Sequence, residues 1–297
     1  MRKKGAKRAA KGTKSAMQAG AAELSSRAVF ATVTSAGKSV KERVAAMPNV
    51  SELVIESEAQ FQGVLKILGN KEEPTPVRLA ALQALQAASF AVIQFESCRG
   101  DYLATLRAVA TDSDLELRQR VLGILTREKD GFAQQRLLEG LENPEKALLP
   151  PEKALQLLSY DVHTEAYPVA RRIVSNPPSV AAKREALRLL AADASSKPLF
   201  EKVLRDKDEA REIRQLSASA LHSIAPSALQ THAREMLLDS KEYSDIQETS
   251  LTALTQFGDQ AKIEQDNTLK KRIGSLQRRK SGKLKQGASH FQAKYGK

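Results

Sequence analysis

The chain has 297 residues, of which 41% are hydrophobic and 28% charged, a composition typical of folded proteins that argues against a largely disordered chain. A single cysteine, Cys98, excludes an intramolecular disulfide and indicates a reducing compartment, for which we expect the cytoplasm. No stretch has the roughly 18 consecutive apolar residues of a membrane-spanning helix, and the net charge of +12 points to an anionic partner.

Residues 1–27 are predicted to be a basic flexible tail, and residues 28–50 a linker or a first helix. The candidate polyanion-binding residues of the tail are Arg2, Lys3, Lys4, Lys7, Arg8, Lys11 and Lys14, which give residues 1–22 a charge of +7 without an acid. Such a segment repels itself and has too little apolar surface to order. An acid-free, alanine-rich leader is also typical of an organellar transit peptide, so an organellar location is the alternative for residues 1–26.

Residues 51–260 are predicted to form an α-solenoid of about six antiparallel helix pairs. An apolar pair with a further apolar residue three positions on recurs at Leu82, Leu122, Leu155, Leu187, Leu221 and, in part, Leu251. These leucines are 30 to 40 residues apart, the length of a helix–turn–helix repeat. Another amphipathic segment precedes each of them, at about 51–68, 99–111, 132–142, 165–175, 197–206 and 227–238. Because one pair cannot bury its two apolar faces alone, we expect the pairs to stack.

The predicted unit resembles the HEAT repeat family over about residues 50 to 257. Acidic turn residues precede an aliphatic–basic pair that opens the second helix of a unit. The examples are Glu72-Glu73 before Val77-Arg78, Asp112 and Asp114 before Leu117-Arg118, and Asp206 and Asp208 before Ile213-Arg214. The resemblance implies an all-α solenoid in which Arg78 and Arg118 link adjacent repeats through acidic side chains. It implies an architecture and not a particular function.

Residues 261–297 are predicted to be a basic C-terminal helix and a flexible basic tail. Ile263, Leu269, Ile273 and Leu276 recur at near-helical spacing, which indicates a last helix. Residues 268–297 carry +10 and no acid. The candidate polyanion-binding residues are Lys270, Lys271, Arg272, Arg278, Arg279, Lys280, Lys283 and Lys285. The two ends leave −5 for residues 23–267, so the basicity belongs to the ends of the chain.

We assign no catalytic, cofactor-binding or metal-binding residue and expect no cofactor. HEAT-like di-iron hydroxylases use His-Glu pairs, which this chain lacks. HEAT-like DNA glycosylases use tryptophan, which it also lacks. We therefore expect a chain without enzymatic activity. HEAT-like phycobilin lyases leave no motif that can be tested here, so a HEAT-like enzyme such as a lyase remains an alternative.

The expected function is that of a scaffold or adaptor. Its solenoid surface is expected to bind a protein partner, while the basic ends contact DNA, RNA or another polyanion nonspecifically. Phe291 and Tyr295 are the only aromatic residues among the C-terminal cations, which does not favour sequence-specific readout. The alternative is a HEAT-like nucleic-acid-binding protein whose solenoid itself follows DNA or RNA. The missing apolar anchor weighs against a membrane surface.

Overall fold

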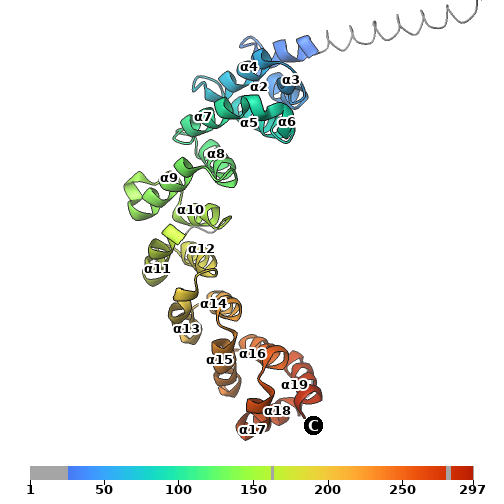
Figure 1. The fold of residues 1–297 in the computed structure, drawn as a ribbon, viewed down its shortest axis with the longest axis vertical. Coiled ribbons are helices and arrows are strands. Elements are labelled where there is room, and N and C mark those ends of the chain that lie inside the picture. The colour runs from blue at the N-terminus through green and yellow to red at the C-terminus, as the bar shows by residue number, and fades with distance from the viewer. Residues whose placement is uncertain (1–25, 162–163, 279–281, 297) are drawn as a thin grey trace, which may run out of the picture. The chain divides into compact units, whose positions relative to one another are not determined.

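The computed structural model describes residues 26–161, 164–278 and 282–296 (Figure 1). All regular elements in these ranges are helices, which confirms the predicted all-α solenoid of stacked helix pairs. The chain divides into two compact units between Arg136 and Leu137. The cations of residues 1–22, together with Arg279 and Lys280, lie outside the described residues.

The first unit contains the predicted pairs 51–88 and 99–127, preceded by additional helices. Residues 28–50, expected to be a linker or first helix, include most of a helix over 26–34, then α2 (Val40–Ala46) and the 3₁₀ helix η1 (Met47–Val50). They are followed by α3 (Leu53–Glu56), α4 (Glu58–Gly69), α5 (Thr75–Ala88), α6 (Val92–Phe95), η2 (Glu96–Cys98), α7 (Arg99–Val109) and α8 (Leu115–Arg127). Helix α9 (Gly131–Glu142) contains the boundary between the units.

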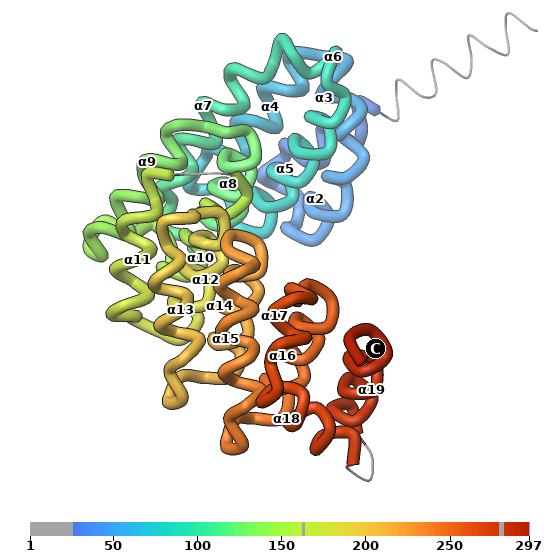
Figure 2. Tube along the Cα trace, turned by 60° about the horizontal axis from the view of Figure 1, so that its bottom comes forward, coloured from blue at the N-terminus to red at the C-terminus, as the bar shows by residue number. Residues whose placement is uncertain are grey.

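The second unit continues the same alternation of helices. Its elements are η3 (Pro144–Lys146), α10 (Pro151–Leu158), η4 (Thr164–Ala166), α11 (Tyr167–Ser175), α12 (Val180–Leu190), η5 (Ala194–Ser196), α13 (Lys197–Arg205), α14 (Arg211–Ile224), α15 (Pro226–Leu238), α16 (Ser244–Phe257), α17 (Gln260–Gln265), α18 (Asn267–Gln277) and α19 (Lys283–Tyr295). Helices α11, α13 and α15 each pack on the helix that follows them, and α12 also packs on α10 and α14 (Figure 2).

The leucines that define the repeat lie in the core of their units. Leu82, Leu122, Leu155, Leu187, Leu221 and Leu251 are each at most 1% exposed. Polar residues begin several of these helices: the Asp114 carboxylate accepts from the backbone N–H of Leu117 at 2.8 Å, and the Ser179 hydroxyl from that of Ala182 at 3.0 Å. Such caps satisfy N–H groups that have no partner within the helix. The turn residues therefore set where each apolar face begins.

A cationic side chain recurs at the fourth position of the second helix of a pair. Arg78 of α5 donates through Nε to the Leu68 carbonyl at 3.0 Å and pairs with Asp112 of the next turn at 2.6 Å. Burial alone would raise the pKa of Asp112, but hydrogen bonds from Arg78 and from the backbone N–H of Asp114 outweigh it and lower this pKa. Arg214 of α14 repeats the arrangement with Leu204 and Glu242.

Other second helices vary this arrangement. Arg118 of α8 donates to the carbonyls of Asp112 and Ser113, in the turn before its own helix, at 2.6 and 2.9 Å. Lys183 of α12 pairs with Glu209, which lies in the turn before α14. The contacts of the cation at this position thus include the preceding helix or turn at Arg78, Arg214 and Arg118, and an acid near the next second helix at Arg78, Arg214 and Lys183.

The C-terminal segment differs from the expected flexible tail. Residues 283–295 form helix α19, which packs on α16 and α18. Its buried residues Leu284, Ala288, Phe291 and Tyr295 form one helical stripe. The Tyr295 hydroxyl contacts the carbonyl oxygens of Leu254, Thr255 and Gly258 at 3.2–3.3 Å. The sequence prediction missed this helix because the segment is rich in basic residues. A buried helical stripe requires an apolar residue at only one position in three or four, so such a stripe fits within a basic segment.

Within the described ranges, no single helix is long and apolar enough to cross a membrane. One bent pair, Thr75–Ala88 with Val92–Val109, meets the length and composition requirement across a bend of 116°. The buried faces of these helices supply core residues of the first unit, among them Leu82 and Leu106.

Candidate functional site

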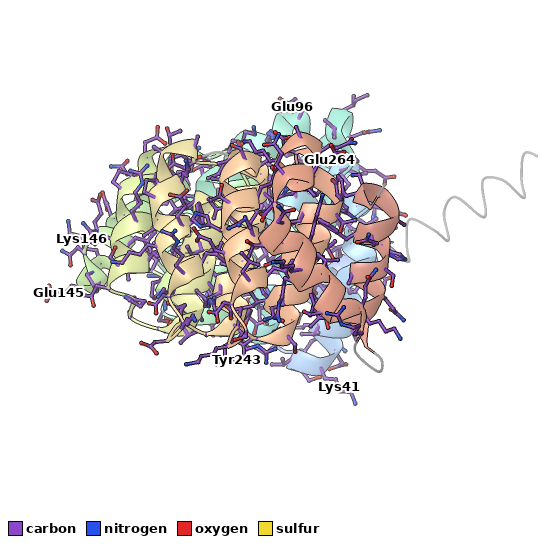
Figure 3. All side chains as sticks on the ribbon, turned by 90° about the horizontal axis from the view of Figure 1, so that it is seen from below. Lys41, Glu96, Glu145, Lys146, Tyr243 and Glu264 are labelled. Carbon is purple, nitrogen blue, oxygen red and sulfur yellow. The ribbon has the colours of Figure 1, made fainter. Side chains whose placement is uncertain are left out.

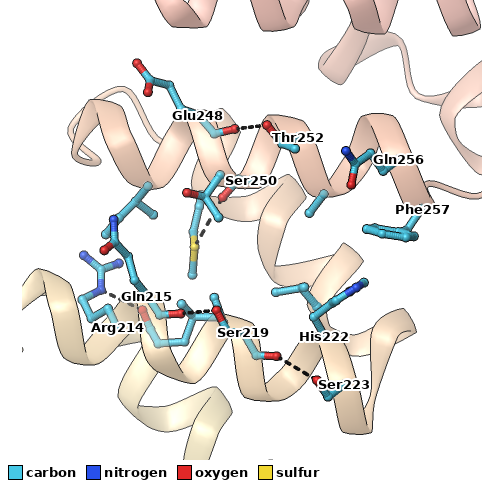
Figure 4. A pocket seen from close by; sticks show the side chains of 17 residues that line it. Arg214, Gln215, Ser219, His222, Ser223, Glu248, Ser250, Thr252, Gln256 and Phe257 are labelled. Carbon is cyan, nitrogen blue, oxygen red and sulfur yellow. Dashed lines mark hydrogen bonds between the residues drawn. The ribbon is translucent and has the colours of Figure 1, made fainter. Parts of the chain in front are cut away.

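A groove of about 590 Å³ lies between α14 and α16 (Figure 4). Leu229 and Met236 of α15 also line it, together with Leu204 of α13. The remaining lining residues are Arg214, Gln215, Ala218, Ser219, His222 and Ser223 of α14 and Ile246, Glu248, Thr249, Ser250, Thr252, Ala253, Gln256 and Phe257 of α16. The groove has a volume within the range of ordinary ligand sites.

The polar groups of the groove are largely engaged by the protein itself. The hydroxyls of Ser219 and Ser223 donate to carbonyls four residues earlier, at 3.1 and 3.4 Å. Thr252 does the same in α16 at 3.0 Å (Figure 4). Because these hydroxyls already have acceptors, the groove presents mainly carbon atoms to an occupant. It is suited to an apolar side chain or segment.

Different groups stand at the two ends of the groove. Toward the start of α16, Glu248 is half-buried, and among the described residues its carboxylate has no ion pair. Toward the ends of α14 and α16, the His222 and Phe257 rings lie 4.3 Å apart between centroids, tilted by 43°. Asp245 is already bound by Arg211 and Gln215. Burial raises its pKa, but the hydrogen bond and charge of Arg211 outweigh this and lower it.

A sequence irregularity accounts for the space between the helices. Four residues after Arg78, Arg118, Lys183 and Gln247, the second helices carry Leu82, Leu122, Leu187 and Leu251. Four residues after Arg214, α14 carries Ala218, which lines the groove. Leu221 lies seven residues after Arg214, one turn later than the other leucines relative to the cation. The missing leucine is a signal from which the groove could have been found.

The C-terminal cations lie on or next to α18, which packs on α15 and α19, and α19, which packs on the groove-forming helix α16. Lys271, Arg278 and Lys283 are exposed and Lys285 is half-buried, and none of the four has an ion pair among the described residues. Lys270 donates to the Glu264 carbonyl at 2.6 Å, and Arg272 to the Leu237 carbonyl at 2.9 Å. We call Lys271, Arg278, Lys283 and Lys285 the cationic surface.

Cations earlier in the second unit are arranged differently. Arg205 pairs with Glu235 at 3.0 Å, Lys207 with Asp239, and Arg211 with Asp245. These pairs join groups 30 to 34 residues apart, about one repeat. Their charge is compensated within the solenoid, whereas no acid follows residue 267.

The described residues contain no group of three or more His, Cys, Asp or Glu side chains that could hold a metal ion. His222 contacts the Phe257 ring, and no hydrogen bond joins it to a groove hydroxyl within the part of the chain that the structure describes. The arrangement favours binding of an apolar group, with no assembled nucleophile and base in the groove.

No family model matches the chain, and no curated protein matches it. Among solved structures it is similar to the complex of CpcE and CpcF of phycocyanin lyase from Nostoc sp. PCC7120. The TM-score is 0.29 and the identity 14%, over 90% of this chain and 94% of that chain. That complex is named as a lyase. This finding contradicts our expectation of a chain without enzymatic activity, and we withdraw that expectation.

Proposed function

We propose that the chain is a scaffold or adaptor whose solenoid surface binds a segment of a partner protein, and whose basic ends contact nucleic acid or another polyanion nonspecifically. The observation that carries the proposal is the groove between α14 and α16, where apolar surface is exposed beside satisfied hydroxyls. An amphipathic helix placing its apolar face in such a groove is a common mode of peptide recognition.

We further propose that the repeats are of the HEAT type. Support comes from the cation at the fourth position of the second helix, which binds both the end of the preceding helix and an acid of the next repeat at Arg78 and Arg214. This arrangement makes each repeat contribute to the placement of its neighbour.

The partner site is tested with a photo-crosslinking residue at Gln256, on the groove. A crosslinked protein is identified and purified, and its affinity is measured for the wild type and for Ala218→Leu, which restores the missing leucine. We expect Ala218→Leu to bind at least tenfold more weakly, with thermal stability unchanged or raised. Ala87→Leu, the same change at an exposed position of α5, is the control. Equal affinity of both variants and the wild type would refute the groove as the site.

The polyanion site is tested by charge removal, because deleting residues 268–297 would also remove buried residues of α18 and α19. The test variant carries Gln at the four residues of the cationic surface. The control carries Gln at four exposed cations that have no ion pair among the described residues, namely Lys41, Lys66, Lys71 and Lys146 (Figure 3 labels Lys41 and Lys146). Both variants have the same net charge.

Binding to a 20-base-pair DNA duplex is measured across a range of salt concentrations. Log K falls as log salt rises, and each lost phosphate contact makes this slope less steep by about 0.9. The slope of the test variant should therefore be less steep than that of the wild type by about 3 to 4. The control should change little. Equal losses in both variants would indicate that net charge alone matters. An unchanged slope, with residues 1–22 also removed, would support the alternative in which the solenoid follows the duplex.

A further inference from the structure

A second surface, in the first unit, exposes apolar side chains. Phe90, Val92 and Ile93, in the turn between α5 and α6 and on α6 itself, are 79, 61 and 87% exposed. Single exposed apolar residues are ordinary, but three large apolar side chains exposed within four positions are a local concentration of the kind that occurs at interaction sites.

The conformation of α6 holds these side chains outward. Phe95, the last residue of α6, is 2% exposed and packs edge-on against Phe61 and Tyr102, with ring centroids 5.8 and 5.4 Å apart. Val92 and Ile93 precede this anchor by three and two residues on a single helical turn. Because the buried aromatic ring orients the short helix, the exposed side chains cannot all turn into the core without displacing Phe95.

The charge near this turn that has no ion pair is acidic, and Arg99, which follows η2, is paired with Glu128. Helix α3 packs beside α6 (Figure 2), and exposed Glu52 and Glu56 lie at its two ends. Glu96 follows α6 and extends away from the ribbon (Figure 3). None of these three carboxylates has an ion pair among the described residues, and neither 44–65 nor 79–98 contains Lys, Arg or His.

We propose that Phe90, Val92, Ile93 and the carboxylates of Glu52, Glu56 and Glu96 form a docking surface for a basic amphipathic segment of a partner protein. The apolar side chains contact its apolar face, and the carboxylates attract its lysines or arginines. Charge complementarity selects this occupant: an acidic segment or an anionic lipid surface meets three uncompensated like charges. The surface is separate from the groove between α14 and α16 and does not depend on the function proposed for it.

The probe is a fluorescent 14-residue Leu/Lys peptide with helical amphipathic spacing, titrated into the full chain and followed by anisotropy. A Leu/Glu peptide of the same pattern and a Leu/Lys peptide of scrambled order are the comparisons. We expect the amphipathic basic peptide to bind on the order of tenfold more tightly than either. Equal binding of the acidic peptide would overturn the proposal.

Two test variants, each with a matched control, show where the peptide binds. Phe90→Ser/Ile93→Ser should weaken it about tenfold, while Tyr243→Ser/Val180→Ser, at exposed apolar positions of the second unit, should not. Glu52→Gln/Glu56→Gln/Glu96→Gln should reduce both the affinity and its salt dependence, unlike Glu145→Gln/Asp208→Asn/Glu264→Gln, at exposed acids elsewhere. Ala218→Leu should leave binding unchanged, which separates this surface from the groove.

The same experiments test two other occupants of this surface, a lipid membrane and a second copy of the chain. The turn lies at the bend of the helix pair that meets the membrane-length requirement, so neutral and anionic phosphatidylcholine-based vesicles are included. Vesicle binding that is lost in Phe90→Ser/Ile93→Ser, with no preference for the basic peptide, would overturn the proposal in favour of lipid. Dimerisation in sedimentation, lost in the same variant, would overturn it in favour of a second copy of the chain.

Discussion

Removing the carboxylate of Glu242 should destabilise the second unit strongly. Arg214 and Glu242 are the most deeply buried ion pair among the described residues, with side chains 1 and 3% exposed. The guanidinium donates twice to the carboxylate, at 2.9 and 2.6 Å, and its Nε donates to the Leu204 carbonyl at 2.9 Å. Glu242→Gln therefore keeps the shape of the side chain and removes the charge that compensates a buried cation.

The magnitude follows from this burial. Breaking a buried pair by removing one partner costs about 3 to 5 kcal/mol, because the remaining charge is neither hydrated nor compensated. The Leu204 carbonyl stays in place and the amide of Gln accepts one hydrogen bond, so we expect about 3 kcal/mol. Replacing both partners, as in Arg214→Met/Glu242→Leu, should recover much of the loss since no buried charge is left.

The assay is urea unfolding followed by circular dichroism, with hydrogen exchange in α13 to α16 as a local measurement. Glu212→Gln is the matched control, because Glu212 is in the same unit, is 64% exposed and pairs with Arg184 at 3.3 Å. It should cost less than about 1 kcal/mol. If Glu242→Gln costs no more than Glu212→Gln, the reasoning is refuted.

The same pair predicts a pH dependence. Burial raises the pKa of Glu242, but hydrogen bonds from Arg214 and the Tyr243 N–H, with the positive charge of Arg214, outweigh it and lower the pKa below its ordinary value. A lowered folded-state pKa gives stability that is present above the unfolded pKa of about 4.3 and is lost as the pH falls through the folded value. The difference between wild type and Glu242→Gln should therefore shrink in acid.

Three further predictions concern other parts of the fold. Leu122→Asp places a charge at a position that is fully buried and should cost about 3 to 5 kcal/mol in urea unfolding; an undiminished stability would contradict the placement of α8. Tyr295→Phe removes the hydroxyl that binds the end of α16 and should cost about 1 kcal/mol, whereas a truly flexible end would show no change. Hydrogen bonds from the side chain and backbone of Ser39 lower the pKa of Glu42 to about 2, so its NMR titration midpoint should rise in Ser39→Ala, and an unmoved midpoint would contradict the capping box.

The helices could be predicted because their signal is local and repeated. Leu82, Leu122 and Leu187 mark buried faces at a fixed place after a turn, and turn residues such as Asp114 mark where the helices begin. Helix α19 was missed although Leu284, Ala288, Phe291 and Tyr295 have helical spacing. Its cations dominated the composition, and composition alone cannot show that one face packs on α16.

The groove was harder to predict because its existence depends on the separation of two helices that are not adjacent in sequence. Ala218 is the local part of the signal, and it becomes visible only when the repeats are aligned on the cation at Arg214. When the repeats are aligned on their apolar pairs, Leu221 occupies the leucine position, and the alignment does not show that Ala218 stands four residues after Arg214. An alignment on the buried cations identifies equivalent positions more reliably than one on the apolar pairs. Shifting a buried cation by one helical turn would leave its charge unpaired.

The distribution of ion pairs changes what the net charge implies about binding. Arg205, Lys207 and Arg211 are about as exposed as ordinary surface cations, at 56, 57 and 51%, yet each lies against a carboxylate of the next repeat. A phosphate at these positions would have to displace that carboxylate or bind beside it, and it would gain little. Lys271, Arg278 and Lys283 have no such competitor within the described residues. Polyanion affinity should therefore follow the number of unpaired cations at the ends of the chain, which is a smaller and more local quantity than the total of Lys and Arg.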